Sequence, residues 1–193
     1  MNSEPISSPK SIVNPQKFVV WLLIISIIML FAGLTSGYIV RRGTGEDWIM
    51  QDLPTYFTIS TALAFLSSIS MYLAVFNFKK KKLNQTSTFI SITLVLGILF
   101  TVCQVLGVLE WYSEGVYVMG SESTPRTQFV FVLGFAHFAH IALALLFLVV
   151  LFIKSRIDIN KGNFATWLSN SAVFWHFLGL LWLYLFIFLN LIP

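Results

Sequence analysis

The stretch FVFVLGFAHFAHIALALLFLVVLFI at residues 129–153 contains no charged side chain. It is longer than the about 20 helical residues that cross the hydrocarbon core of a bilayer. Pro125 and Arg126 precede it, and Lys154 and Arg156 follow it, so both of its ends are marked. A segment inside lipid must satisfy its own backbone hydrogen bonds, which a helix does. The stretch therefore predicts a transmembrane helix.

Four further apolar stretches of similar length lie in the chain, and short polar clusters separate them. We place them at residues 18–40, 56–78, 89–109 and 168–192. Hydrophobic residues make up 57% of the 193 residues and charged residues 10%, against roughly 25% charged in soluble domains. The sequence predicts an all-α integral membrane protein with five transmembrane helices at residues 17–193, preceded by a polar tail at residues 1–16. The first apolar stretch is too long for the core of a signal peptide, so we expect no cleaved leader.

The distribution of Lys and Arg predicts the orientation in the membrane. If the N-terminus is cytoplasmic, the basic residues on the inner side are Lys10, Lys17, Lys79, Lys80, Lys81, Lys82, Lys154, Arg156 and Lys161. Those left outside are Arg41, Arg42 and Arg126. This excess satisfies the positive-inside rule. We therefore expect a cytoplasmic N-terminus in a bacterial inner membrane, and five spans then put the C-terminus outside.

The connecting segments exclude several classes of function. All are short, which leaves no room for a catalytic or haem-c domain outside the membrane, and the chain lacks a nucleotide-binding Gly-rich loop and a CxxCH motif. The spans lack the charged pore-lining groups, repeats and broken helices of channels and transporters, so a small transporter is a less favoured alternative. We expect no catalytic centre, no resident cofactor or metal, and no nucleic-acid partner in this chain.

The candidate functional side chains are the few strongly polar groups within the spans. The histidines are His137 and His140, three residues apart on one helix face, and His176 in the last span. Taking 1.5 Å per residue, His140 lies roughly 20 Å and His176 about 12 Å from the inner ends of their spans. A metal site or a bis-imidazole haem is the alternative interpretation, but no span offers a carboxylate and the two depths differ. Neutral histidines that are hydrogen-bonded across helices, to lipid phosphate or to the backbone are favoured.

Other residues point to helix packing. Gln104, at depth in the third span, predicts a hydrogen bond between helices rather than a substrate contact. Four small residues in the first span would let a helix of this chain or of a partner approach closely, namely Ala32, Gly33, Ser36 and Gly37. The run Lys79 to Lys82 either fixes the topology, which is the simpler interpretation, or binds anionic lipid headgroups.

Four motifs resemble subunit III of the haem-copper respiratory oxidases, in the order in which that family has them. SIIMLFAGL at residues 26–34 is similar to a Ser-Glu-x-x-x-Phe-Ala-Gly segment, and LGILFTVCQVLGVLEWYSEGVY at residues 96–117 to a Gly, Phe, Gln pattern that ends in Gly-Val-Tyr. AHFAHI at residues 136–141 carries His-x-x-His. FWHFLGLLWLYLF at residues 174–186 resembles Trp-His-Phe-x-Asp-x-x-Trp, with Trp175, His176 and Trp182 at the matching positions. Five spans resemble the short bacterial form.

The resemblance implies the non-catalytic subunit III of an aa3-type cytochrome c oxidase that serves aerobic respiration. It implies packing on subunit I, an association with subunit II and other respiratory-complex subunits, and bound structural phospholipid, with haem and copper only in the partner subunits. A quinol oxidase, or a subunit III-like accessory of nitric-oxide reductase, is the alternative host. The residues that would contact lipid or neighbouring helices are Gln104, His137, His140, Trp175, His176 and Trp182.

Three positions depart from the family pattern. Ile27 and Gly107 stand where the family commonly has glutamate, and Gly179 stands where it has aspartate. A proton relay needs groups that change charge. The resemblance therefore gives no support at these positions to a role of this chain in proton uptake.

Overall fold

The described part of the chain is a bundle of long helices. The structure is a computed structural model that describes residues 15–44, 48–49, 51–157, 159 and 163–192. Its helices are α1 (Pro15–Thr44), α2 (Thr55–Lys79), α3 (Leu83–Ser113), α4 (Pro125–Ile157) and α5 (Phe164–Leu191), and these residues contain no strand. Each helix is long and apolar enough to cross a membrane. This confirms the all-helical prediction with five spans.

The helices are longer than the apolar stretches on which the prediction rests. Four of them contain the whole stretch and continue past it at both ends, while α5 begins earlier but ends at Leu191. Polar residues at the membrane surface continue a helix without difficulty, so the end of an apolar run does not mark the end of the helix. The predicted tail residues 1–14, and Glu46, Asp47, Asp158, Lys161 and Pro193, lie outside the described residues.

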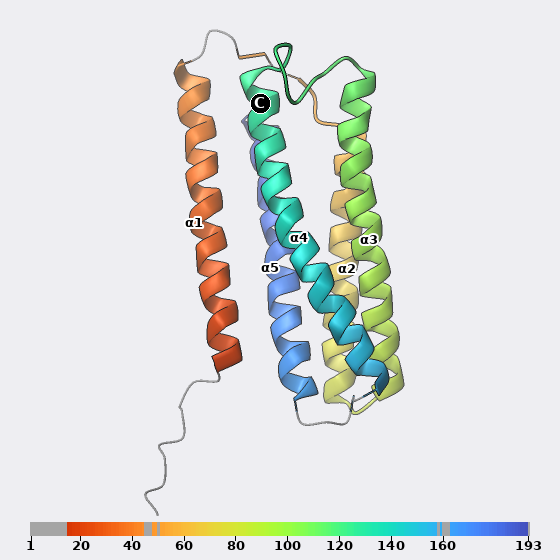
Figure 1. Cartoon of the computed structure of the whole chain (residues 1–193). Helices are drawn as coiled ribbons and strands as arrows, with labels where there is room; N and C mark the ends of the chain where they lie inside the picture. Colours follow the sequence, from red (N-terminus) through yellow and green to blue (C-terminus); the bar gives the residue numbers. More distant parts are fainter. Residues whose placement is uncertain (1–14, 45–47, 50, 158, 160–162, 193) are drawn as a thin grey trace, which may run out of the picture.

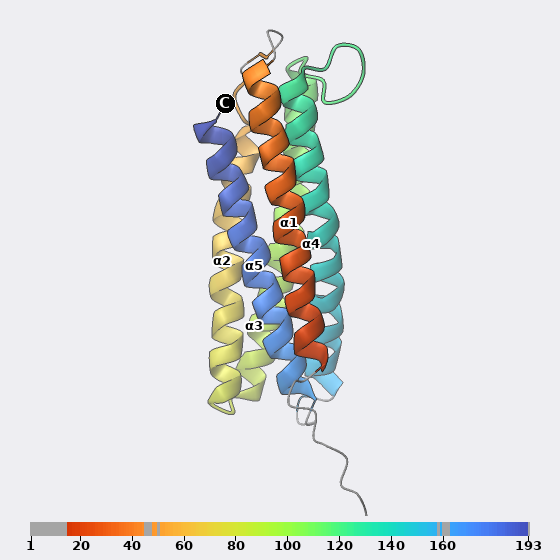
Figure 2. The same ribbon diagram turned by 90° about the vertical axis from the view of Figure 1, so that its left-hand side faces the viewer.

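Four of the helices form the bundle and the fifth is attached to its side. Helix α2 packs against α3 and α5, and α4 packs against the same two helices, so that α2, α3, α4 and α5 form a closed ring. Helix α1 contacts α4 and α5 and lies over that side of the ring (Figure 1 and Figure 2). The connections α1–α2 and α3–α4 share one end of the bundle, here called the outer end, and α2–α3 and α4–α5 share the inner end (Figure 1).

Helices α2 and α3 form a tight hairpin at the inner end. The turn between them is short, and Lys81 takes the left-handed conformation with φ 59°. Two backbone hydrogen bonds close it, from the Lys81 N–H to the Phe78 carbonyl at 2.9 Å and from the Lys82 N–H to the Asn77 carbonyl at 3.0 Å. Bonds of this kind satisfy the carbonyls at the end of a helix. The basic turn thereby fixes the antiparallel pairing of α2 and α3.

The first connection is fastened to the outer ends of α3 and α4. Arg126, at the start of α4, is 2% exposed and donates a hydrogen bond to the Gln51 carbonyl. Trp111, near the end of α3, is also 2% exposed, and its indole N–H donates to the Asp52 carbonyl at 3.0 Å. These bonds satisfy carbonyls that a non-helical segment leaves unpaired, and they hold residues 51–54 against the bundle.

Candidate functional site in the centre of the bundle

Hydroxyl groups along α2 accept hydrogen bonds from side chains of α3 and α5. The donor–acceptor pairs are Gln104 Nε2 to Ser60 Oγ at 2.9 Å, Trp182 Nε1 to Thr61 Oγ1 at 3.0 Å and Trp175 Nε1 to Ser67 Oγ at 3.2 Å. Each hydroxyl donates its own proton to a carbonyl of α2, at 2.8 Å in every case. The hydroxyls are therefore oriented as acceptors toward their neighbours, and this polar network connects three helices inside the membrane.

Three of the predicted residues, Gln104, Trp175 and Trp182, take part in this network, but their acceptors on α2 were not predicted. Ser60 and Thr61 were not singled out from the sequence. A signal was available, because Ser60, Ser67 and Ala74 recur every seven residues and all three are buried. Small residues at that spacing share one helix face and let neighbouring helices approach closely.

His137 lies at the centre of the bundle and is 1% exposed. Its ring stacks on that of Trp182, with centroids 5.4 Å apart, and the rings of Phe31 and Phe100 meet it edge-on at 6.4 and 6.2 Å. Neither ring nitrogen has a hydrogen-bond partner in the structure. His137 is therefore a polar group in the bundle interior whose hydrogen bonding the described residues leave incomplete.

The other two histidines lie in different surroundings. His140 is half-buried beside Phe31 of α1, and its Nδ1 lies 2.6 Å from the Ala136 carbonyl of its own helix. His176 lines a groove between α2 and α5. Although α4 and α5 are neighbours, His140 and His176 lie on different faces of them. Among the residues that the structure describes, no group of three or more His, Cys, Asp and Glu side chains comes together as metal ligands.

The three positions at which the family has carboxylates are packed by other side chains here. Ile27 is 2% exposed in the core. A Cβ atom added at Gly107 would lie 2.5 Å from the Phe57 ring, and one added at Gly179 would lie 3.1 Å from Ser68 Oγ. Phe57 thus fills the space that a side chain at position 107 would need, and helix packing replaces ionisable chemistry at that position.

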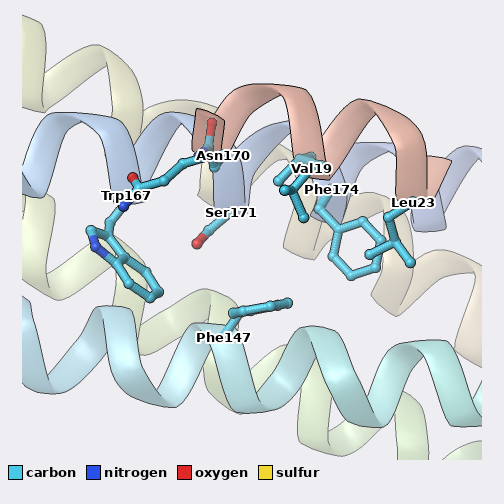
Figure 3. Close-up of a pocket in the computed structure, with 9 residues that line it drawn as sticks. Val19, Leu23, Phe147, Trp167, Asn170, Ser171 and Phe174 are labelled. Atoms are coloured by element: carbon cyan, nitrogen blue, oxygen red, sulfur yellow. The ribbon is translucent and has the colours of Figure 1, made fainter. Parts of the chain in front are cut away.

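A cleft of about 250 Å³ opens between α1 and the α4–α5 pair toward the inner end (Figure 3). Its walls are mainly apolar, with Leu23 from α1 and Phe147 and Phe174 from the bundle. The polar side chains at its edge include Asn170 and Ser171. Nearby, the Lys154 ammonium lies 4.7 Å from the centre of the Trp167 ring, which also lines the cleft. The cleft therefore has apolar walls, with polar and basic groups near one end.

Curated proteins match the chain over most of its length, although no family model matches it. The cytochrome bo(3) ubiquinol oxidase subunit 3 of Buchnera aphidicola is 26% identical over 195 residues, which cover 99% of this chain and 93% of that protein. The probable quinol oxidase subunit 3 of Staphylococcus saprophyticus is 25% identical, covering 90% and 87%. The cytochrome c oxidase subunit 3 of Alkalihalophilus pseudofirmus is 29% identical, covering 86% and 81%.

The fold and the polar network define a multi-pass helical membrane protein whose buried polar groups connect its own helices. The relatives indicate one family within this class of membrane proteins, because all three are named as subunit 3 of an oxidase. The chain is a homologue of subunit III of the haem-copper respiratory oxidases, and it is a multi-pass protein of the bacterial plasma membrane. This confirms the resemblance that the four sequence motifs indicated.

Proposed function

We propose that the chain is the non-catalytic subunit III of a respiratory cytochrome c oxidase of the aa3 type, in which it packs on subunit I and stabilises the complex. The observation that carries this proposal is that polar side chains within the spans form hydrogen bonds between helices of this chain. Gln104, Trp175 and Trp182 bond to hydroxyls of α2, and packed apolar or small residues occupy the three carboxylate positions. Such a bundle suits support of a neighbour better than proton transfer.

Electron donor and cofactors belong to the partner subunits in this proposal. Haem and copper would reside in subunits I and II. A quinol oxidase is the second candidate host, because two of the three relatives reported above are named as quinol or ubiquinol oxidase subunits. Identifying the haem-bearing chain that copurifies with this subunit in mild detergent distinguishes the two hosts directly.

The groove between α2 and α5 is the face that suits a helix of a partner subunit. It measures about 710 Å³, and its mainly apolar lining includes the polar and small residues Thr58, Ser68, His176 and Gly179. The side chains of Thr58, Ser68 and His176 form no hydrogen bond with any described residue. Ser68 and His176 lie near the middle of their helices, at a depth where lipid offers only hydrocarbon. A transmembrane helix with a hydrogen-bonding side chain at mid-depth would satisfy them.

Site-directed photocrosslinking tests this face. A photoreactive residue at Leu180, which lines the groove and is 66% exposed, should crosslink to the haem-bearing subunit. Val95 on α3 and Met29 on α1 are 56% and 71% exposed and serve as controls on other faces. Crosslinks from a control position but not from Leu180 would place the interface elsewhere and leave the proposed function intact. The absence of any crosslink, together with failure to copurify with an oxidase, would refute the function itself.

The cleft beside α1 is the proposed site of structural phospholipid. Its apolar walls fit an acyl chain, and Lys154, Asn170 and Ser171 lie where a headgroup would sit. Basic groups near the membrane surface attract anionic headgroups. Native mass spectrometry of the purified complex should detect tightly bound phospholipid, and Ser171→Phe, which fills the cleft, should lower its amount. An unchanged lipid content in that variant would contradict the assignment.

Removal of the subunit tests the supporting role. An oxidase purified without this chain should keep most of its initial rate of oxygen reduction but lose activity sooner during turnover. Complete loss of haem from subunit I would instead indicate a role in assembly. An unchanged working life would show that the chain does not stabilise the enzyme. Reconstitution with the purified chain is the control, because it should restore the working life.

A further inference from the structure

His137 needs a hydrogen-bond partner that the polypeptide does not supply. It is 1% exposed, and both of its ring nitrogens are buried without a partner. Most buried side-chain polar atoms have a partner in the protein or in ordered water, and an unsatisfied group in a membrane interior is costly. The rings of Phe31, Phe100 and Trp182 surround the imidazole, and none of them accepts a normal hydrogen bond in the plane of the imidazole.

A small cavity lies against His137, and its size selects its occupant. Its volume is about 10 Å³, and its polar lining consists of His137, Ser67 and the two indoles Trp175 and Trp182. About one probe sphere of space, on the order of 10–15 Å³, is the least that holds one water molecule. A lipid chain, a haem or a coordinated metal ion with its ligands needs far more room. The cavity therefore fits one water molecule and nothing larger.

Besides His137, the polar side chains that line the cavity leave one free hydrogen-bond site for such a water. The indole N–H groups of Trp175 and Trp182 already donate to Ser67 and Thr61. Ser67 Oγ donates to the Ala64 carbonyl at 2.8 Å and accepts from Trp175. A hydroxyl has one donor and two acceptor sites, so Ser67 retains one free acceptor site. A water that donates to Ser67 can also bond to a nitrogen of His137.

We infer that the cavity binds one water molecule that connects His137 of α4 to Ser67 of α2. The two partners meet the lower limit of the two to four that a buried water requires. The bridge extends the polar network to α4, which lies across the ring from α2, and no described residues of these two helices are in close backbone contact. His137 then acts as a packing residue that holds a water, and the cavity leaves no space for a ligand-binding role of its ring. This inference does not depend on which oxidase the chain serves.

Two measurements on the full-length chain, purified from its own membrane with any attached subunits, test the bridge. The first is a structure at a resolution that reveals ordered water, in which a single peak should lie within hydrogen-bond distance of a His137 nitrogen and of Ser67 Oγ. The second is solid-state nuclear magnetic resonance with ¹⁵N-histidine, in which a hydrogen-bonded ring nitrogen differs in chemical shift from a free one. His137→Phe assigns the signal, because the chain has only three histidines.

Ser67→Ala and Ser70→Ala form a matched pair of variants. Both remove a buried hydroxyl of α2, but Ser70 Oγ bonds to the Phe89 carbonyl of α3 and does not line the cavity. Ser67→Ala should shift the His137 signal and remove or displace the peak, whereas Ser70→Ala should leave both unchanged. Free ring nitrogens in the wild-type chain, a peak from a larger ligand, or equal effects of the two variants would overturn the inference. The His140 signal reports whether each variant keeps its fold.

Discussion

Indole and amide donors meet hydroxyl acceptors in pairs at the residue scale, and each pair joins two helices. The Trp182 indole and the Thr61 hydroxyl lie 3.0 Å apart, and Thr61 also donates to its own helix at 2.8 Å. A hydrogen bond between transmembrane helices contributes about 0.6 kcal/mol on average and up to about 1.7 kcal/mol. The pairs therefore define which faces of the helices meet more than they add to stability.

A double-mutant cycle on Trp182 and Thr61 measures one such pair. Trp182→Phe keeps most of the ring but loses the N–H donor, and Thr61→Val keeps the shape but loses the acceptor. Each should lower the free energy of unfolding, with a coupling energy of about 1 kcal/mol between them. Denaturant unfolding in mixed micelles is the measurement. Strictly additive effects would show that the hydrogen bond contributes nothing.

Glycine substitutions test whether packing has replaced the family carboxylate at position 107. A Cβ at Gly107 would lie 2.5 and 2.7 Å from atoms of the Phe57 ring, closer than real contacts allow. Gly107→Ala should therefore destabilise the chain by about 1–3 kcal/mol, seen as a lower thermal midpoint, and Gly107→Glu by at least as much. Phe57→Leu should relieve part of the effect in a double variant.

Gly33→Ala is the matched control for that experiment. Gly33 is also in a transmembrane helix, but a Cβ there meets no heavy atom within 4 Å. The substitution should leave the thermal midpoint unchanged or raise it slightly, because alanine favours a helix by about 1 kcal/mol over glycine. Equal loss of stability in both variants would mean that Phe57 does not specify glycine at position 107.

The sequence singled out Gln104, Trp175 and Trp182, but it left the partners of their side chains open. Family motifs identify a residue without saying what it contacts, and the acceptors are common hydroxyl residues with no motif of their own. The same limit applies to Gly107, since the absence of a carboxylate is visible in the sequence but Phe57, fifty residues earlier along the chain, is not recognisable as its replacement. Such pairs depend on how the helices are arranged in space.

Helix α1 is the least integrated element. It buries a single stripe of side chains. Two side-chain hydrogen bonds join its outer half to α5 and the residue after it, from Tyr38 Oη to the Ile192 carbonyl at 2.8 Å and from Tyr184 Oη to Thr35 Oγ1 at 3.2 Å. Toward the inner end the cleft separates it from α4 and α5 (Figure 3). Of the small residues expected to pack tightly, Gly33 meets no neighbour and Gly37 meets a Phe129 ring carbon at 3.7 Å.

Tyr38→Phe should loosen α1 without disturbing the α2–α3 hairpin. The variant keeps the aromatic contacts of the fully buried ring but loses the bond to the Ile192 carbonyl. A loss of about 1 kcal/mol corresponds to about fivefold faster opening, so backbone hydrogen exchange in α1 should speed up by about that factor. Tyr56→Phe, on the exposed surface of α2, is the control. Faster exchange spread equally over all helices would contradict the view of α1 as a separable element.

Apolar length and flanking charges were sufficient to predict the helices, whereas their pairing was not predictable. Nearly every position of these helices is apolar whether it faces lipid or protein, so the one-sided pattern that identifies the buried face of a soluble helix is absent. Nothing in residues 18–40 indicates that α1 contacts α4 and α5 rather than α2, its neighbour in sequence.

The whole molecule has a clear difference in charge between its two ends. The described basic residues at the inner end are Lys17, Lys79, Lys80, Lys81, Lys82, Lys154 and Arg156, and the described acidic residues lie at the outer end as Asp52, Glu110, Glu114 and Glu122. The described basic residues at the outer end are Arg41, Arg42 and Arg126, and Arg126 is buried against Gln51. The Lys80 ammonium lies 4.2 Å from the Phe76 ring. Basic groups beside aromatic rings are typical of a membrane surface.

This asymmetry predicts that the inner end faces the cytoplasm, and cysteine labelling measures it. In a Cys103→Ser background, Ser121→Cys lies in the outer connection and Gln85→Cys in the first turn of α3 at the inner end, and both positions are exposed. Neither substitution alters a charge, so the topogenic signal is unchanged. A membrane-impermeant maleimide should label position 121 in intact spheroplasts and position 85 only after lysis. Because the helices alternate in direction, labelling at position 85 alone in intact cells would reverse all five spans at once, and labelling at both would mean that the bundle does not cross the membrane in one orientation.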